Sequence, residues 1–351
     1  MASIIGTTGN DTLIDLSGAA DTIWGDLQGT LLDLGGNDKI YGRADYDTIY
    51  GDADSIGTAG KGGHDYLSGG DGDDNLYGDA RFALFGIGGN DVLYQNAGSG
   101  ILAGDATVLA AGARGGDDKL YGTGFLFGDN LGIISSAIGG NDLLDASQAT
   151  AGSTLGGDGA GSVEGASICG SDVLKGSAFD DTLGADSFGA LSDTSIGGND
   201  RLWGNGGNDL LLGDAGGAIE DFARGGNDIL RGDAGNDRIY GDGASLKGLA
   251  VGGKDKLYGG AGDDQLWGDG SVLDDAIGGK DRFFFEGSFG DDTVSDFRKG
   301  EDKLVFTGHQ PDELQITVVG SDTVLTTLGD DSVTLKGFTG ALTYGTDILF
   351  A

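Results

Sequence analysis

The chain has 351 residues, of which 75 are glycine, and its 57 acidic and 20 basic residues give a formal net charge of −37. One proline excludes collagen-like and polyproline segments, and one cysteine, Cys169, excludes a disulfide framework and a four-cysteine zinc site. The negative charge disfavours nucleic acids and anionic membranes as partners, because like charges repel. Hydrophobic residues still make up 38% of the chain and recur at regular intervals, which argues against disorder.

The N-terminal segment has no recognisable targeting signal. Residues 1–16 lack the basic stretch, apolar run and small-residue cleavage site of a secretory signal peptide. No segment approaches the roughly 18 consecutive apolar residues of a transmembrane helix. Two locations therefore remain open: the cytoplasm, or the outside of the cell after export without a cleaved N-terminal signal.

A nine-residue unit repeats from residue 6 to residue 294. It has a glycine-rich turn, an aspartate at the sixth position and an aliphatic residue at the eighth, as in GNGGNDLLL from Gly204. Glycine permits positive φ, so the first part of the unit predicts a turn. The three residues after the aspartate predict a very short strand whose middle side chain points into the core.

A longer period of three units lies over the nine. Each third unit starts with Gly-Asp, as at Asp52 and Asp79, and then loses the pattern, so we interpret the third units as looser turns or loops. Two units of about nine residues then form one coil of about 18 residues. At a spacing of about 4.8 Å, residues 1–282 would give about 16 coils and a rod of about 75 Å. The expected fold class is all-β, a parallel β-roll or β-solenoid with a thin core.

Stacking of coils would bring the sixth-position aspartates into columns along the edges of the rod. Carboxylates about 5 Å apart repel strongly, and a thin apolar core can hardly offset that repulsion. Calcium would remove the conflict, because it accepts six to eight oxygen ligands from carboxylates and backbone carbonyls in flexible geometry. Magnesium demands a tighter octahedron, and zinc and copper prefer His and Cys, of which the chain has two and one.

The nonapeptides resemble those of RTX (repeats-in-toxin) proteins, and the resemblance covers residues 6–294. In that family the sixth-position aspartate and the turn carbonyls bind several Ca²⁺ ions between successive coils. Gly100 stands where an aspartate is expected, so its unit is expected to bind no ion. The resemblance implies these aspartate ligands: Asp38, Asp47, Asp65, Asp74, Asp91, Asp118, Asp142, Asp172, Asp181, Asp200, Asp209, Asp228, Asp237, Asp255, Asp264 and Asp281. It implies these carbonyl ligands: Gly72, Gly207, Gly235 and Gly262.

The C-terminal segment is expected to differ from the repeats. Alternating stretches such as 303–306 and 332–335 predict strands that would cover the open end of the roll. Residues 283–351 also resemble the C-terminal region of type I secretion substrates, in which an ABC exporter reads an uncleaved signal. We therefore expect an RTX β-roll over 1–282, a cap and secretion region over 283–351, and a secreted or cell-surface location.

No catalytic site is expected. The repeats begin at Gly6, and HExxH, GxSxG and P-loop motifs are absent from the sequence. The two histidines, His64 and His309, lie far apart in sequence. The expected function is that of a secreted, non-enzymatic, calcium-binding protein with a structural, adhesion or polysaccharide-binding role, or one of self-association. The alternative is a secreted effector similar to small rhizobial nodulation RTX proteins, which would act on host membranes.

Aromatic residues recur at the ninth position of the repeat. This position follows the buried eighth residue, so strand alternation is expected to turn it outward. We expect exposed aromatic ladders, shared between two sheets, that either stack on each other or bind sugar rings or a second rod. The aromatic residues at the ninth position are Trp24, Tyr41, Tyr50, Tyr77, Tyr94, Tyr121, Trp203, Tyr240, Tyr258 and Trp267.

Overall fold

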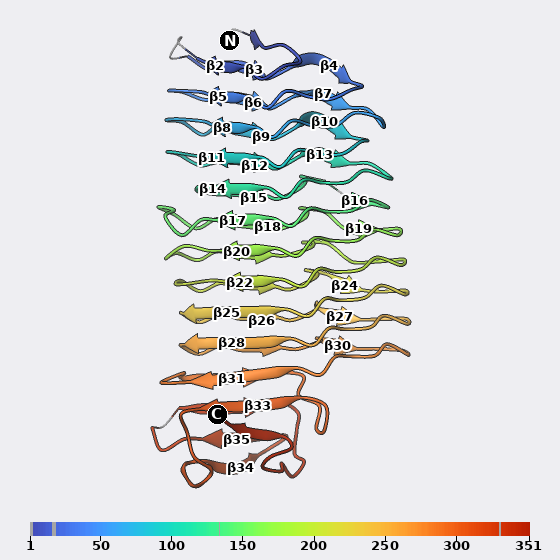
Figure 1. Ribbon diagram of the computed structural model, residues 1–351. Helices are drawn as coiled ribbons and strands as arrows, with labels where there is room; N and C mark the ends of the chain where they lie inside the picture. The colour runs from blue at the N-terminus through green and yellow to red at the C-terminus, as the bar shows by residue number, and fades with distance from the viewer. Residues whose placement is uncertain (1–2, 16–18, 133, 330) are drawn as a thin grey trace.

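The computed structural model is an elongated parallel β-solenoid whose coils stack along one axis (Figure 1). It describes residues 3–15, 19–132, 134–329 and 331–351. The solenoid has about ten turns, and the two ends of the chain lie towards opposite ends of the stack. The expected all-β fold class, a parallel β-solenoid, is therefore confirmed.

Two long sheets and a shorter third side make up the wall of the solenoid. Sheet 1 contains, in spatial order, β1 (Ser3–Ile5), β3 (Thr22–Trp24), β6 (Thr48–Tyr50), β9 (Asn75–Tyr77), β12 (Gly100–Ala103), β15 (Gly124–Phe127), β18 (Thr154–Gly156), β21 (Thr182–Gly184), β23 (Leu210–Leu212), β26 (Arg238–Tyr240), β29 (Gln265–Trp267), β32 (Asp291–Val294), β36 (Ser332–Leu335), β35 (Asp322–Thr326) and β34 (Gln315–Val319). Sheet 2 contains β2 (Thr12–Ile14), β5 (Lys39–Tyr41), β8 (Tyr66–Ser68), β11 (Val92–Tyr94), β14 (Lys119–Tyr121), β17 (Leu143–Asp145), β20 (Val173–Lys175), β22 (Arg201–Trp203), β25 (Ile229–Ala234), β28 (Lys256–Ala261), β31 (Arg282–Glu286), β33 (Lys303–Thr307) and β37 (Ile348–Phe350).

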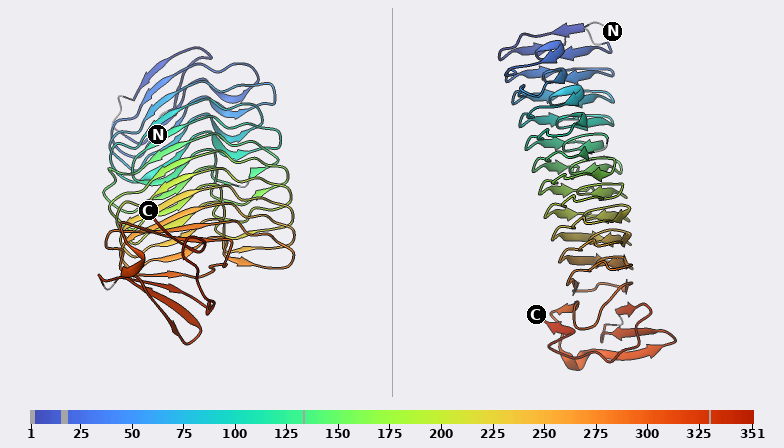
Figure 2. Two further views of the ribbon diagram at one scale, coloured as in Figure 1. Left: turned by 60° about the horizontal axis from the view of Figure 1, so that its bottom comes forward. Right: turned by 90° about the vertical axis from the view of Figure 1, so that its right-hand side faces the viewer.

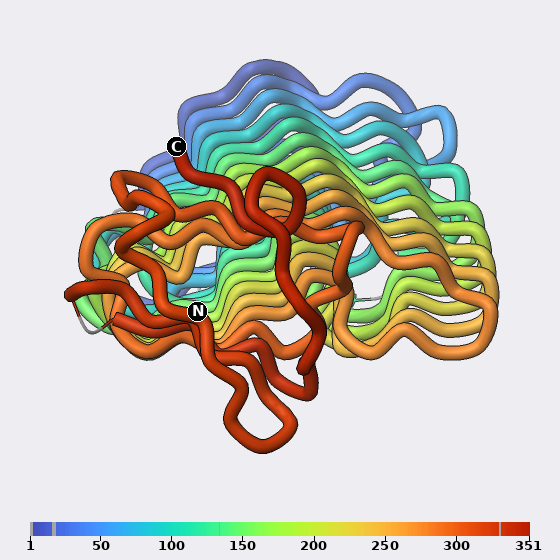
Figure 3. The backbone as a smooth tube through the Cα atoms, turned by 90° about the horizontal axis from the view of Figure 1, so that it is seen from below, coloured from blue at the N-terminus to red at the C-terminus, as the bar shows by residue number. Residues whose placement is uncertain are grey.

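The third side consists of short strands in three groups. They are β4 (Leu27–Leu31), β7 (Ala53–Ile56), β10 (Ala80–Leu84) and β13 (Ala106–Leu109), then β16 (Ile134–Ser135) and β19 (Val163–Glu164), then β24 (Ala218–Ile219), β27 (Ser245–Leu246) and β30 (Ser271–Val272). Seen along the axis, each coil is elongated, with the two long sheets at one end and the third side at the other (Figure 3).

One coil contains three nonapeptide units, so the expected two-unit coil and the expected 16 coils are wrong. Ile40 pairs with Leu67 in sheet 2, and Ile23 pairs with Ile49 in sheet 1. The step between equivalent residues of neighbouring coils varies from 24 to 30 residues up to Asp281 and is 21 residues from Asp281 to Asp302. The third unit is thus a regular side of each coil, where the sequence had indicated a loose turn or loop.

The physical reason is that the third units have a core of their own. Leu31, Ile56 and Leu84 lie in register on neighbouring coils and are almost fully buried. Together with small residues such as Ala80, they form a cluster separate from the main core. The main core between sheets 1 and 2 is the expected ladder of eighth-position Leu and Ile side chains. Burial of both ladders stabilises a three-sided coil.

The C-terminal segment continues the two long sheets and then covers the end of the stack (Figure 2). β31 and β33 extend sheet 2, and β36 pairs with β32 in parallel before an antiparallel meander of β36, β35 and β34 closes sheet 1. A 3-10 turn over Pro311–Glu313 precedes β34. β33 and β36 contain the two strands expected here, and parallel pairing runs through the boundary expected at residues 282 and 283.

The aromatic side chains form ladders on both long sheets, but they are less exposed than expected. Trp24, Tyr50 and Tyr77 stack in sheet 1 with ring centroids 5.6 and 5.1 Å apart, and at most 9% of each side chain is exposed. On sheet 2 Tyr94 and Tyr121 stack at 4.7 Å and are half-buried. Equivalent units lie in the same sheet because the coil has three units, and rings at the coil spacing cover each other's faces. In the described ranges, no helix is long and apolar enough to cross a membrane.

Candidate metal centre

The sixth-position aspartates form two columns parallel to the solenoid axis. The waist column precedes the strands of sheet 2, where the chain returns from the third side, and the edge column precedes the strands of sheet 1 at the far end of each coil. The waist column consists of Asp11, Asp38, Asp65, Asp91, Asp118, Asp142, Asp172, Asp200, Asp228, Asp255, Asp281 and Asp302. The edge column consists of Asp21, Asp47, Asp74, Asp181, Asp209, Asp237, Asp264 and Asp292.

Each waist aspartate is held by the preceding coil. The backbone N–H of Asp38 donates to Oδ1 of Asp65 at 2.7 Å, and the N–H of Asp65 donates to Oδ1 of Asp91 at 2.7 Å. The same bond recurs in every coil up to that from Asp281 to Oδ1 of Asp302, at 3.1 Å. The second oxygen, Oδ2, is buried and has no hydrogen-bond partner in Asp38, Asp65, Asp91, Asp118, Asp142, Asp172, Asp200, Asp228, Asp255 and Asp281.

A second set of aspartates faces the waist column. They follow the strands of sheet 1 from β3 to β29, and we call them the Gly-Asp carboxylates because glycine precedes all of them except Asp186, which follows Ala185. Asp52 accepts the backbone N–H of Gly63 at 3.0 Å, and Asp79 accepts that of Gly89 at 3.0 Å. The set consists of Asp26, Asp52, Asp79, Asp105, Asp129, Asp158, Asp186, Asp214, Asp242 and Asp269, all almost fully buried.

The sequence had not indicated the Gly-Asp carboxylates as candidate ligands. Their signal was the recurring Gly-Asp dipeptide, which had been interpreted only as the start of a loop. Each one lies between two hydrophobic clusters, one in the main core and one in the third side, so its position depends on the three-sided coil.

Glycine leaves room for oxygen atoms at the waist. A Cβ at Gly51 would overlap the carbonyl oxygen of Gly78 and Oδ2 of Asp65. A Cβ at Gly62 would overlap the carboxylates of Asp79 and Asp52. We define a waist cell as the space bounded by one waist aspartate and the Gly-Asp carboxylates before and after it, here Asp52, Asp65 and Asp79. In this cell carboxylate and carbonyl oxygens face one another, and no ion pair joins these three carboxylates to a basic side chain of the described residues.

Burial makes these carboxyl groups hard to ionise. Desolvation, followed by the charges of Asp65 and Asp79, raises the pKa of Asp52 well above its ordinary value. Desolvation also raises the pKa of Asp38 to about 7 and that of Asp281 to about 8. Buried carboxylates without a positive partner either take up protons or bind a cation, because an isolated buried charge is very costly.

The edge column is interrupted in the middle of the chain. The N–H of Asp47 donates to Oδ1 of Asp74 at 2.8 Å, but Gly100 takes the place of the next aspartate. There the side-chain amide of Gln95 donates to the carbonyl oxygens of Gly72 at 2.6 Å and Ala97 at 2.8 Å. This amide lies among oxygens that a cation would otherwise contact, and it occupies the Gly72 carbonyl that was expected to bind calcium.

Beyond the gap the edge column resumes. The N–H of Asp209 donates to Oδ1 of Asp237 at 2.7 Å, and Asp237 repeats this bond to Asp264. A Cβ at Gly235 would overlap the carbonyl of Gly207, and one at Gly262 would overlap that of Gly235, so these turn carbonyls stack closely. Buried Oδ2 atoms without a hydrogen-bond partner occur here in Asp209, Asp237, Asp264 and Asp292.

All the expected aspartate ligands therefore fall into one of the two columns. The waist column holds Asp38, Asp65, Asp91, Asp118, Asp142, Asp172, Asp200, Asp228, Asp255 and Asp281, and the edge column holds Asp47, Asp74, Asp181, Asp209, Asp237 and Asp264. Neighbouring members of each column are linked by the amide-to-carboxylate bond, except across the gap between Asp74 and Asp181.

One waist cell contains a thiol. Cys169 takes the place of the first glycine of its turn, and its Sγ and the carboxylates of Asp158 and Asp186 lie within 4.8 Å of one another. Burial, then the charge of Asp158, raises the pKa of this thiol well above its usual range. The thiol is therefore protonated at neutral pH, and this cell offers one soft ligand among the hard oxygens of its neighbours.

The donor set suits calcium. Unpaired buried carboxylate oxygens and crowded glycine carbonyls provide several oxygen ligands in a flexible arrangement. Such an arrangement suits Ca²⁺ better than Mg²⁺. The family model of the RTX calcium-binding nonapeptide repeat (4 copies) matches residues 30–55, 59–80, 197–217, 222–245 and 250–271. None of the curated proteins compared with the chain matches it. RTX nonapeptide repeats bind calcium, and this chain contains such repeats, wound into a parallel β-solenoid.

Proposed function

We propose that this protein is a secreted, non-enzymatic, calcium-binding RTX protein that folds on extracellular calcium and serves as a structural or adhesion module. The observation that carries the proposal is the waist column, in which buried Oδ2 atoms have no hydrogen-bond partner. A fold with this many uncompensated carboxylates needs a cation to be stable at neutral pH.

The chain's own residues would hold the ions in two ways. In a waist cell, Oδ2 of the waist aspartate and the flanking Gly-Asp carboxylates would be ligands, and in the edge turns Asp209, Asp237 and Asp264 would act with the carbonyls of Gly207, Gly235 and Gly262. Bound calcium supplies the positive charge that these buried oxygens lack. Roughly ten ions would cancel about 20 of the negative charges.

A calcium titration tests the proposal. Followed by far-UV circular dichroism, the chain should be largely unfolded in excess chelator and should gain β structure as calcium is added. Magnesium at the same concentrations is the matched control and should be much less effective, because it demands a smaller octahedral site. A β spectrum that excess chelator leaves unchanged would contradict the proposal.

A secreted location is supported by the same chemistry and by the C-terminal resemblance. A chain that stays unfolded at low cytosolic calcium can pass through an exporter, and millimolar calcium outside the cell would then fold it. Residues 283–351 resemble type I secretion regions, so an ABC exporter is the proposed partner during export.

The ligand we propose for the adhesion role is a polysaccharide. A hollow of about 500 Å³ opens on sheet 2, where Tyr94, Tyr121, Asp145 and Gln148 line it. Tyr121 is the last ring of its stack, and Asp145 is its neighbour in register on the next coil. A flat aromatic ring beside a carboxylate and amides suits the apolar face and hydroxyl groups of a sugar. Binding to a glycan array with calcium should fall for Tyr121→Ala and remain for Tyr240→Ala, and equal loss would contradict this assignment.

A second candidate function is that of an effector acting on host membranes. It is favoured by exposed apolar side chains of the third side, since Leu32, Phe82 and Phe222 are 69%, 52% and 60% exposed. Release of a trapped dye from lipid vesicles by the calcium-loaded protein would support this function. No release, together with glycan binding, would favour adhesion.

A further inference from the structure

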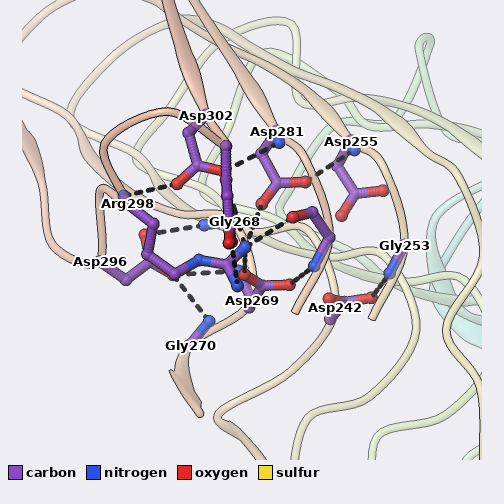
Figure 4. Close-up of polar contacts among 12 residues, drawn as sticks. Asp242, Gly253, Asp255, Gly268, Asp269, Gly270, Asp281, Asp296, Arg298 and Asp302 are labelled. Carbon is purple, nitrogen blue, oxygen red and sulfur yellow. Dashed lines mark hydrogen bonds and ion pairs between the residues drawn. The ribbon is translucent and has the colours of Figure 1, made fainter. Parts of the chain in front are cut away.

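The waist column ends at an arginine. Arg298 lies between β32 and β33, and its guanidinium contacts the carboxylate of Asp269 directly (Figure 4). It also lies 3.9 Å from Oδ2 of Asp281 and 3.6 Å from Oδ1 of Asp302. All three carboxylates are almost fully buried. The guanidinium is therefore the positive charge shared by the last Gly-Asp carboxylate, Asp269, and the last two waist aspartates, Asp281 and Asp302.

The guanidinium takes a place that a carboxylate occupies in the coils before it. A Cβ at Gly225 would meet the carboxylates of Asp242 and Asp214, which flank that turn. At the equivalent Gly278, a Cβ would meet Asp269 on one side and Nη1 of Arg298 on the other. The last cell thus keeps the preceding Gly-Asp carboxylate, Asp269, but has a guanidinium where its predecessors have the following one.

The aspartate that could have completed this cell is engaged elsewhere. Asp296 accepts the backbone N–H groups of Gly268, Asp269 and Gly270 at 3.1, 2.9 and 2.8 Å (Figure 4). Its carboxylate therefore closes the end of β29 and leaves the cell open for the arginine side chain.

Arg298 also contacts a backbone oxygen, as an ion in the cell would. Its Nη2 donates to the carbonyl oxygen of Gly279 at 2.7 Å. On the outer side Nη1 lies 3.1 Å from Glu301, which is half exposed and holds the side chain in place. Carboxylates and a glycine carbonyl around one positive group reproduce the donor set of the waist cells.

We propose that Arg298 replaces a calcium ion in the last waist cell, so that this cell is charge-compensated without calcium and binds no ion. The inference rests on the proposed function, because it takes the cells before it to be calcium sites. It also predicts that β31 and β33 stay joined when calcium is removed from the rest of the column.

The test compares Arg298→Met with the wild-type full-length chain. Native mass spectrometry at saturating calcium should count one more ion in the variant, because Asp269, Asp281 and Asp302 then face one another without a cation. In chelator, hydrogen exchange of the β31 and β33 amides should be slow in the wild type and fast in the variant. Arg298→Lys, which keeps one positive charge, should retain the wild-type ion count.

Arg282→Met is the matched control, because Arg282 is exposed on β31 and, among the described residues, forms no ion pair with a waist carboxylate. It should change neither the ion count nor the exchange rates. An Arg298→Met variant with the wild-type ion count would overturn the inference, as would one that fails to fold at saturating calcium. A wild type that binds no calcium would instead overturn the proposed function. Slow exchange of the β31 and β33 amides in chelator would still show that Arg298 compensates the last cell, so failure of the proposed function and failure of this inference remain distinguishable.

Discussion

At the scale of single residues, the two oxygens of a waist aspartate have different surroundings. Oδ1 of Asp118 accepts the N–H of Asp91 at 2.6 Å, whereas its Oδ2 is buried without a partner. An asparagine at this position keeps one acceptor oxygen but loses the charge. Any effect of that substitution therefore reports on the cation.

We predict that Asp118→Asn raises the calcium concentration needed for folding and destabilises the calcium-loaded protein by about 1–3 kcal/mol. Urea unfolding at saturating calcium measures the loss. The neighbouring Asp117 is exposed, so Asp117→Asn makes the same charge change and should alter stability by less than about 0.5 kcal/mol. Equal effects of the two substitutions would show that the waist position has no special role.

The raised pKa values of the aspartates predict that a lower pH favours folding without calcium but weakens calcium-dependent folding. Burial raises the pKa of Asp38, Asp209 and Asp264 to about 7 from the ordinary 3.8. The calcium-free folded state therefore holds protons that the unfolded chain has released. Its stability is greatest below pH 3.8 and is lost as the pH rises through about 7.

In chelator we expect more β structure at pH 5 than at pH 8, measured by circular dichroism with light scattering to exclude aggregates. With calcium, protons compete with the ions, so the midpoint of the calcium titration should rise as the pH falls from 8 to 5. A calcium midpoint that does not change over this range would contradict the assignment of these carboxyl groups as ligands.

At the scale of the elements, the third side explains both what the sequence predicted and what it missed. The nine-residue period places Asp65, Asp74 and the Leu of each strand correctly, because these depend only on local turn and strand geometry. It could not place Asp52, since the surroundings of that residue depend on how many units close one coil. That number is decided by side chains such as Ile56 and Leu84, whose spacing does not follow the nonapeptide.

We predict that Ile219→Ala in the third side destabilises the calcium-loaded protein by about 2–4 kcal/mol, because Ile219 is fully buried. Phe222→Ala removes a larger side chain from the same segment but one that is 60% exposed, so it should have little effect. Urea unfolding at saturating calcium compares them. If the third side were a loose loop, both substitutions would be nearly neutral.

At the scale of the whole molecule, the sequence predicts the fold class but not the number of coils. The fold class and the calcium chemistry follow from composition and periodicity, because a net charge of −37 beside a thin core requires bound cations. The number of coils does not follow, because a closed coil of two units and one of three bury similar ladders of Leu and Ile in the main core. The preference for three appears only when the second cluster is formed.

Removal of residues 302–351 should block export and leave calcium binding by the waist aspartates from Asp38 to Asp255. The truncation deletes most of the segment that resembles a secretion region, residues 283–351, together with β33 to β37. Detection of the protein in the medium of cells that carry its exporter measures the first effect, and ion counting of the purified truncated protein measures the second. Truncated protein found in the medium would place the signal elsewhere.

The long coil also decides how the molecule responds to a pulling force. Each coil contributes only about 4.8 Å to the length of the rod. One coil contains about 27 residues, as between Asp38 and Asp65, and this length of chain measures about 90 Å when extended. A chain of this kind lengthens almost twentyfold per coil released. Under the proposed function, ions in the waist cells would bridge neighbouring coils, so calcium would set the force at which the rod starts to unfold.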